Sequence, residues 1–181
     1  MAIDENRTFI PISIAIMTVS DTRKPEDDRS GDTLAKRVVD AGHRLADRTI
    51  ITDDVEAIQM QINDWVARDD IDAIITTGGT GFTGRDVTPD ALEPLFDKRM
   101  EGFSIAFHML SHEKIGTSTI QSRATAGVIQ STFVFCLPGS PGACKDGWDG
   151  ILKAQLDYRH RPCNFVEIMP RLDEHLKRGN G

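Results

Sequence analysis

The segment IDAIITTGGTGFTGRDVTPDAL, residues 71–92, joins an apolar run of strand length to a loop with four glycines. A glycine-rich turn directly after a strand can present several backbone N–H groups to an anion, because glycine adopts positive φ angles and permits close approach. In a parallel sheet, such turns gather at the carboxyl ends of the strands, where ligands bind. The segment therefore predicts an anion-binding loop at one end of an α/β sheet.

The residues before this segment alternate between strand and helix patterns. A nearly continuous apolar run at 10–20 predicts a strand buried on both faces, and residues 43–51 predict a second, less buried strand. Helices are predicted at 33–41 and at 54–68, where apolar residues follow the i, i+4, i+7, i+8 spacing of one helix face. With the strand at 71–77, this alternation predicts a parallel sheet with right-handed crossovers.

The second half of the chain has weaker patterns. At 88–90, threonine is predicted as a helix N-cap, followed by proline at the first helical position and an acid in the first turn. Pro94 limits the length of that helix. Helices are also predicted at 102–113 and 143–156, and a strand is predicted within 132–143, where an apolar run breaks into a glycine and proline loop.

The composition is that of one soluble globular domain. The chain has 181 residues, of which 39% are hydrophobic and 27% charged. We expect a single domain over residues 1–165 and a charged tail over 166–181. No apolar stretch approaches the roughly 18–20 residues that a membrane helix requires, and MAIDENRTFIP at the start lacks the pattern of a signal peptide. We therefore expect a cytoplasmic protein that does not enter a membrane.

The charge and the cysteines exclude further classes. A formal net charge of -7 argues against sequence-independent binding of nucleic acid, which needs a basic face. The cysteines at 136, 144 and 163 match neither a CxxC metal site nor a small disulfide framework, so we expect reduced thiols.

The glycine loop satisfies neither common nucleotide-binding motif. Residues 79–84 match GxGxxG, but Pro89 delays the helix, and position 104, where a dinucleotide site needs an acid, is Ser104. The same residues match the start of a P-loop, but Arg85 and Asp86 stand where lysine and serine or threonine are required. We therefore do not predict an NAD site or a Walker-type site.

Asp86 is the unexpected residue of the loop. A carboxylate beside bound phosphate repels it unless a cation lies between them, and Mg²⁺ binds through one or two carboxylates together with substrate phosphates. Asp86 therefore suggests a magnesium site. The alternative is a tight turn in which Asp86 bonds its own backbone.

The glycine segment resembles the signature of the MoaB/MogA family of molybdenum cofactor biosynthesis proteins. The resemblance covers roughly residues 10–165 and favours the MoaB branch. It continues through EGF (101–103), GTSTIQSRATAGV (116–128), LPGSPGACKDGW (137–148) and RPCNF (161–165).

This resemblance implies a three-layer, doubly wound α/β fold with a mostly parallel sheet and helices on both faces. It also implies homo-oligomers, either trimers or hexamers of paired trimers, and it leaves open contacts with other proteins of the cofactor pathway. The implied chemistry is adenylyl transfer from Mg-ATP to the terminal phosphate of molybdopterin, with pyrophosphate as the second product. A non-catalytic protein that binds molybdopterin and passes it on is the alternative.

In that family, two carboxylates serve the metal and the transfer, and by motif they fall on Asp86 and Asp54. Asp53 is adjacent and could take the second role with a shift of one residue. From the residues alone, either aspartate could instead be the N-cap of the helix that begins near Val55. The nucleophile is a phosphate oxygen with a second pKa near ~6, so no general base is required.

The remaining site residues are assigned by hypothesis to two groups. Backbone N–H groups of the glycine loop hold the nucleotide phosphates, and two residues at the end of the first strand form the pocket wall; these are Gly78, Gly79, Thr80 and Gly81, with Ser20 and Asp21. The pterin and its phosphate are received by Ser122, Arg123, Pro138, Gly139 and Ser140.

Overall fold

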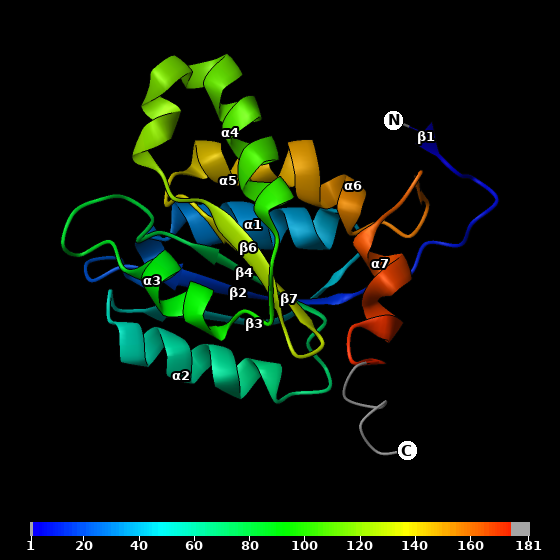
Figure 1. The fold of residues 1–181 in the computed structure, drawn as a ribbon, viewed down its shortest axis with the longest axis horizontal. Coiled ribbons are helices and arrows are strands. Elements are labelled where there is room, and N and C mark those ends of the chain that lie inside the picture. The colour runs from blue at the N-terminus through cyan, green and yellow to red at the C-terminus, as the bar shows by residue number, and fades with distance from the viewer. Residues whose placement is uncertain (1, 175–181) are drawn as a thin grey trace.

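A computed structural model describes residues 2–174, in which a six-stranded sheet forms the middle of the molecule (Figure 1). Its strands are β2 (Ser13–Val19), β3 (Arg44–Ile51), β4 (Ala73–Thr77), β5 (Lys98–Arg99), β6 (Thr125–Ile129) and β7 (Thr132–Leu137). They lie in the order β3-β2-β4-β7-β6-β5, and β6 runs opposite to the other five. Two short strands, β1 (Ala2–Ile3) and β8 (His160–Arg161), pair separately in antiparallel fashion.

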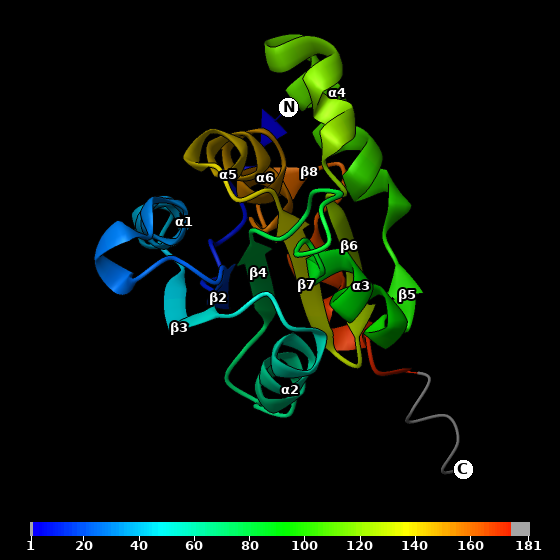
Figure 2. The same ribbon diagram turned by 90° about the vertical axis from the view of Figure 1, so that its left-hand side faces the viewer.

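Helices cover both faces of the sheet, which makes three layers (Figure 2). The helices are α1 (Arg29–Asp40), α2 (Val55–Val66), α3 (Thr88–Leu92), α4 (Glu101–Ile115), α5 (Pro141–Gly147), α6 (Lys153–Gln155) and α7 (Phe165–Ile168). Short 3-10 segments are η1 (Pro25–Asp27), η2 (Glu93–Leu95), η3 (Gly116–Gln121) and η5 (Met169–Arg171), and η4 (Trp148–Leu152) is a π-helical turn. The predicted three-layer, mostly parallel α/β architecture is confirmed.

Alternating strand residues supply the two halves of the core. Ile14 and Ile16 of β2 face α1, α4 and α5, whereas Ala15 and Met17 face α2 and α3. Side chains of β2, β4 and β7 are buried along their whole length, as expected for central parallel strands. β3 lies at the edge of the sheet and is only partly buried, in agreement with its weaker apolar pattern.

The three predicted strands that correspond to β2, β3 and β4, and the two predicted helices that correspond to α1 and α2, are confirmed, with shifts at their ends. The first helix starts at Arg29, four residues before the prediction, because the carboxylate of Asp28 accepts the Gly31 N–H at 3.0 Å and caps it. The prediction that Thr88 is an N-cap is wrong. The helix starts at Thr88, after Val87, and the Thr88 hydroxyl donates to the Gly78 carbonyl at 2.9 Å.

Two strands beyond the glycine loop were not predicted. β6 reads TAGVI, in which glycine and alanine weaken the strand pattern. Gly127 is required there because the Phe96 ring occupies the space that a Cβ atom would fill. β5 has only two residues, too few to show any periodicity.

The expected boundary between domain and tail falls inside α7. Val166 is buried, and Phe165, Met169 and Leu172 pack against the core beside α1, α4 and α5. The first part of the predicted tail therefore belongs to the domain, and residues 175–181 lie outside the described residues. Among residues 2–174, none of the helices combines the length and apolar character needed to cross a membrane.

Candidate functional site

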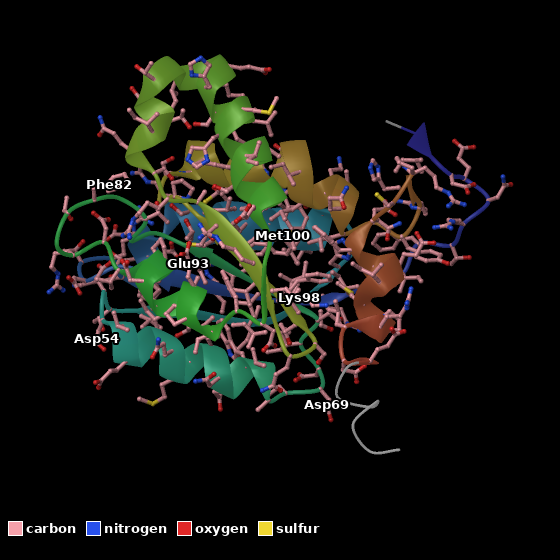
Figure 3. All side chains as sticks on the ribbon, in the orientation of Figure 1. Asp54, Asp69, Phe82, Glu93, Lys98 and Met100 are labelled. Carbon is pink, nitrogen blue, oxygen red and sulfur yellow. The ribbon has the colours of Figure 1, made fainter. Side chains whose placement is uncertain are left out.

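The loops that follow β2, β4 and β7 converge on a cavity of 400 Å³ at the carboxyl ends of these strands. Ligands of open α/β sheets bind in this position. In Figure 3, Phe82 marks the projecting glycine loop and Asp54 the start of α2, on the same side of the molecule. The cavity is lined by Val19, Ser20, Thr22, Arg23, Asp53, Gly78, Gly79, Thr80, Gly81, Arg85, Asp86 and Gly139.

Two glycines make the loop possible. Gly78 and Gly79 have φ angles of 105° and 61°, in the left-handed region that favours glycine. A Cβ atom on Gly78 would collide with the Val19 carbonyl, and one on Gly79 with the Thr88 hydroxyl. The loop can therefore lie directly against β2 and α3 only with glycine at both positions.

Backbone donors in the loop divide between structure and binding. The Gly78 N–H donates to the Leu137 carbonyl at 3.1 Å, which removes it from the set predicted to hold phosphate. In residues 2–174, the N–H groups of Gly79 and Thr80 have no acceptor at hydrogen-bond distance. These two donors border the cavity, so they can serve an anion that enters it.

Asp86 caps its own turn and also lines the cavity. Its Oδ2 accepts the Thr83 hydroxyl at 2.6 Å and the Thr83 N–H at 3.0 Å, which is the turn structure considered from the sequence. The hydrogen bond from the Thr83 hydroxyl lowers the pKa of Asp86 and keeps it ionised. A Cβ atom on Gly81 would lie 2.7 Å from this carboxylate, so glycine leaves room for it.

The structure distinguishes Asp53 from Asp54. Asp54 is the N-cap of α2, because its carboxylate accepts the Ala57 N–H at 2.8 Å, and it does not line the cavity. The catalytic and metal-binding role expected for Asp54 therefore does not fit its position. Asp53 does line the cavity, and it exchanges backbone and side-chain hydrogen bonds with Asp21 at 3.0 and 3.1 Å.

Asp53 and Asp86 place two negative charges at the same cavity. Burial, and then the charge of Asp86, raise the pKa of Asp53. A cation between the two carboxylates would remove this repulsion. Residues 2–174 contain no group of three or more acidic, histidine or cysteine side chains able to hold a metal. Two carboxylates completed by substrate phosphates are nevertheless a donor set that suits Mg²⁺.

Arg123 organises the glycine loop. Its guanidinium donates to the carbonyls of Gly81 and Asp86 and to both carboxylate oxygens of Asp90, and its backbone N–H donates to the Thr80 carbonyl. The Arg123 guanidinium also lies 5.6 Å from the centre of the Phe82 ring. Because these contacts direct all three guanidinium nitrogens to the loop and to Asp90, and Arg123 does not line the cavity, its predicted role of receiving the pterin phosphate does not fit the structure.

The other residues predicted to receive the pterin differ in position. Of the loop after β7, Gly139 lines the cavity, whereas Ser140 caps α5 and the Pro138 carbonyl accepts the Thr77 hydroxyl. Ser122 does not line the cavity, and its buried hydroxyl has no partner within residues 2–174.

A second cavity, of 630 Å³, lies beside the first along the edge strand β3. Ser20 and Arg23 line both cavities, so the two share a wall. The larger cavity is lined by Ser20, Asp21, Arg23, Lys24, Pro25, Arg48, Thr49, Ile50, Ile51 and Thr52. Its size suits a small heterocycle placed next to the loop cavity.

Arg23 and Arg85 line the loop cavity but were not predicted as site residues. Arg23 lies in a loop with several charges after the first strand, and no sequence motif separates it from its neighbour Lys24. The available signal was its position at the carboxyl end of a parallel strand.

The two buried thiols are unsuited to nucleophilic chemistry. Burial raises the pKa of Cys136 to about 12 and that of Cys144 to about 11. Both are therefore protonated near neutral pH, whereas the reactive form of cysteine is the thiolate.

Comparisons with known proteins show similarity along most of the chain. The family described as "Probable molybdopterin binding domain" matches residues 15–158. Molybdenum cofactor biosynthesis protein B of Escherichia coli (strain K12) is 51% identical over 157 residues, which cover 87% of this chain and 92% of that protein. A crystal structure of a molybdenum cofactor biosynthesis protein B matches with a TM-score of 0.79 and 34% identity over 95% of this chain and 99% of the other. A tungsten cofactor synthesizing protein MoaB from Pyrococcus furiosus has a TM-score of 0.74 and 30% identity over 90% of this chain and 98% of its own.

Proposed function

The chain belongs to the molybdopterin-binding domain family, together with the molybdenum cofactor biosynthesis B proteins, and from this premise we propose that it adenylylates molybdopterin with Mg-ATP. The products are adenylyl-molybdopterin and pyrophosphate. One observation carries the proposal beyond binding. The acids Asp53 and Asp86 face one cavity beside a glycine loop in which the N–H groups of Gly79 and Thr80 have no partner among residues 2–174.

The proposed reaction needs positioning and charge neutralisation. An oxygen of the terminal phosphate of molybdopterin attacks the α-phosphorus of ATP, a new P–O bond forms, and the bond to the β-phosphate oxygen breaks. The electron pair of that bond leaves with pyrophosphate. Because a phosphate monoester with a second pKa near ~6 is already largely ionised at neutral pH, no side chain has to remove a proton.

We assign the metal to Asp53 and Asp86. Mg²⁺ held there supplies positive charge to the nucleotide phosphates. The N–H groups of Gly79 and Thr80 bind phosphate oxygens, and Arg123 keeps the loop in shape. Asp54 has a structural role in this scheme, as the N-cap of α2.

The decisive experiment incubates purified protein with molybdopterin and Mg-ATP and measures adenylylated product and pyrophosphate. We expect product with the wild type and with Asp54→Asn, because asparagine is also a good N-cap. We expect a loss of at least about a hundredfold with Asp53→Asn and with Asp86→Asn, since each removes a charge that serves the metal and the transferred group. Tight pterin binding without product in the wild type would instead support the non-catalytic carrier.

We also propose that the protein works as a homo-oligomer in the cytoplasm. Helix α4 buries Phe103 and Phe107 against the sheet, yet it exposes Ile105 and Met109 on its other side, at 62% and 65%. A cavity of 620 Å³ lies along this outer side. Apolar surface of this kind favours association with further copies of the chain, and the resemblance implied trimers or hexamers. Fractionation and the mass in solution test the location and the assembly.

A further inference from the structure

We infer that Arg23 is the cation of this site that binds the reacting phosphates, an assignment that rests on the proposed function. The ligand class is a polyphosphate, here the triphosphate of ATP or the pyrophosphate that leaves. Arg23 lines both the cavity of the glycine loop and the larger cavity along β3. It is therefore within reach of a ligand that spans the two.

The position of Arg23 is defined by contacts with distant parts of the chain. Its Nη2 donates to the Gly139 carbonyl at 2.6 Å, and its Nη1 donates to the Ser30 hydroxyl at 3.0 Å. The Ser30 hydroxyl also donates to the Gly139 carbonyl, at 2.8 Å. Gly139 lies directly against Gly78, because a Cβ atom on Gly139 would be 3.0 Å from the Gly78 Cα. Arg23 therefore joins the loop after β2 to the loop after β7, which in turn lies against the glycine loop.

The buried carboxylate of Asp28 forms an ion pair with the guanidinium of Arg23. Asp28 is fully buried and lies 3.8 Å from Nη1 of Arg23. Burial disfavours the charge of Asp28, but hydrogen bonds from Arg48, the Gly31 N–H and Thr18 outweigh it and lower the pKa of this carboxyl. Asp28 thus stays ionised and keeps the guanidinium in place before a substrate arrives, as electrostatic catalysis requires.

Arg23 has donors to spare for a ligand. A guanidinium carries five N–H groups, and two of those on Arg23 donate to Ser30 and Gly139. In the part of the chain that the structure describes, the other three have no acceptor at hydrogen-bond distance. The side chain is 30% exposed, so a ligand can reach it. The planar fork of guanidinium donors matches the oxygens of a phosphate.

The neighbouring arginines are less suited to this role. Arg123 directs its guanidinium to Gly81, Asp86 and Asp90. Arg85 also lines the cavity, but its side chain is 68% exposed and pairs with Asp21. Arg23 combines access to the cavity with rigid support. It offsets the charge that develops on the leaving oxygen when the bond between the α- and β-phosphates breaks.

The test compares Arg23→Gln with Arg68→Gln. Arg68 is a matched control, because it is also ion-paired and has a similar exposure of 34%, but it lies beyond the far end of α2. Calorimetry gives the Kd for Mg-ATP and for magnesium pyrophosphate. We expect Arg23→Gln to weaken both by roughly tenfold to a hundredfold, the effect of losing charged hydrogen bonds, and Arg68→Gln to bind like the wild type. Arg23→Lys restores part of the affinity, because lysine keeps the charge but not the fork of donors.

A second measurement uses the wild type and does not depend on folding of a variant. Phenylglyoxal, which modifies arginine, labels Arg23 in the free protein, and saturating Mg-ATP or magnesium pyrophosphate protects Arg23 but not Arg68 by mass spectrometry. Wild-type affinities of Arg23→Gln for both ligands overturn the assignment. If that variant does not fold, labelling of wild-type Arg23 that saturating ligand does not reduce overturns it. Neither measurement requires turnover, so a wild type that binds these ligands but forms no product contradicts the proposed adenylyl transfer alone.

Discussion

The negative charge of Asp53 destabilises the folded protein. Its carboxylate lies in a partly buried position where the charge of Asp86 opposes its ionisation, so the pKa of Asp53 is raised. Asp86 is different, because hydrogen bonds from Thr83 lower its pKa. Two neighbouring carboxylates destabilise the folded state unless a cation lies between them. Such a pair is therefore expected at a site that binds a cation.

We therefore predict that removing the charge of Asp53 stabilises the folded protein at neutral pH. An acid whose pKa is raised by folding makes the folded state less stable when it is ionised, and this cost disappears as the pH falls below the pKa of the unfolded chain, near ~3.9. We therefore expect Asp53→Asn to raise the melting temperature at pH 7 by roughly 1–3 °C. The gain should stay constant well above the raised pKa of Asp53 and shrink as the pH falls through that pKa toward ~3.9, as measured by differential scanning calorimetry.

Magnesium supplies the control for this prediction. Mg²⁺ binding should raise the melting temperature of the wild type and leave that of Asp53→Asn nearly unchanged, because a ligand stabilises only the state that binds it. A destabilised Asp53→Asn at pH 7 would contradict the electrostatic interpretation.

At the scale of elements, α2 and the loop between β4 and α3 form one wall of the site. The start of α2 is set by Asp54, which leaves Asp53 in the extended residues that enter the cavity wall. The loop is set by Arg123, which donates to carbonyls at both ends of the Gly81–Asp86 turn. Asp54, the neighbour of Asp53 in the chain, thus fixes the start of α2. Arg123, which donates to the Asp86 carbonyl, fixes the loop.

The N-cap of α2 can be tested directly. We expect Asp54→Ala to lower the free energy of unfolding by about 1 kcal/mol, because the Ala57 N–H loses its acceptor, and Asp54→Asn to stay close to the wild type. Urea denaturation measures both. Equal stabilities of the two variants would show that the cap contributes little.

The contacts of Arg123 with the glycine loop predict that a substitution there weakens ligand binding but leaves the sheet folded. Replacing Arg123 with glutamine removes the donors to Gly81 and Asp86, so the loop should sample other conformations and bind Mg-ATP about tenfold or more weakly. Titration calorimetry measures the Kd, and far-UV circular dichroism checks the fold. Wild-type affinity in this variant would mean that the turn holds its shape through Thr83 and Asp86 alone.

At the scale of the whole molecule, α4 and η3 project from the body of the fold (Figure 1). Helix α4 is apolar on two sides, with Phe103 and Phe107 in the core and Ile105 and Met109 exposed. η3 adds a further exposed apolar side chain, Ile120, at 70%. Exposed apolar side chains that lie on neighbouring elements favour association with another protein surface.

We therefore expect the double variant Ile105→Glu with Met109→Glu to dissociate the proposed homo-oligomer. Two new negative charges at a shared apolar contact would repel each other and their counterparts. Light scattering coupled to size-exclusion chromatography measures the mass. Met60→Glu is the control, because Met60 is 71% exposed on α2 and lies outside the α4 surface. An unchanged mass in the double variant would place the contact elsewhere.

Much of the fold could be predicted because its signals are local. The apolar runs of β2, β4 and β7 and the periodicity of α2 depend on neighbours along the chain, and so do the glycines that make the turn after β4. The family motif also pointed to Asp86, whose carboxylate lines the cavity. Short β5 and glycine-containing β6 were missed because their pairing partners, not their own residues, make them strands.

The choice between Asp53 and Asp54 required the tertiary structure, since two adjacent aspartates have the same local chemistry. The backbone at the end of β3 turns one toward Asp21 and the cavity and leaves the other to cap α2. Arg23 is a still clearer case, because its contact with Gly139 spans 116 positions of the chain. Periodicity and motifs describe which residues can form an element or a loop. Which charges meet depends on the packing of distant segments, and that is set by the folded core as a whole.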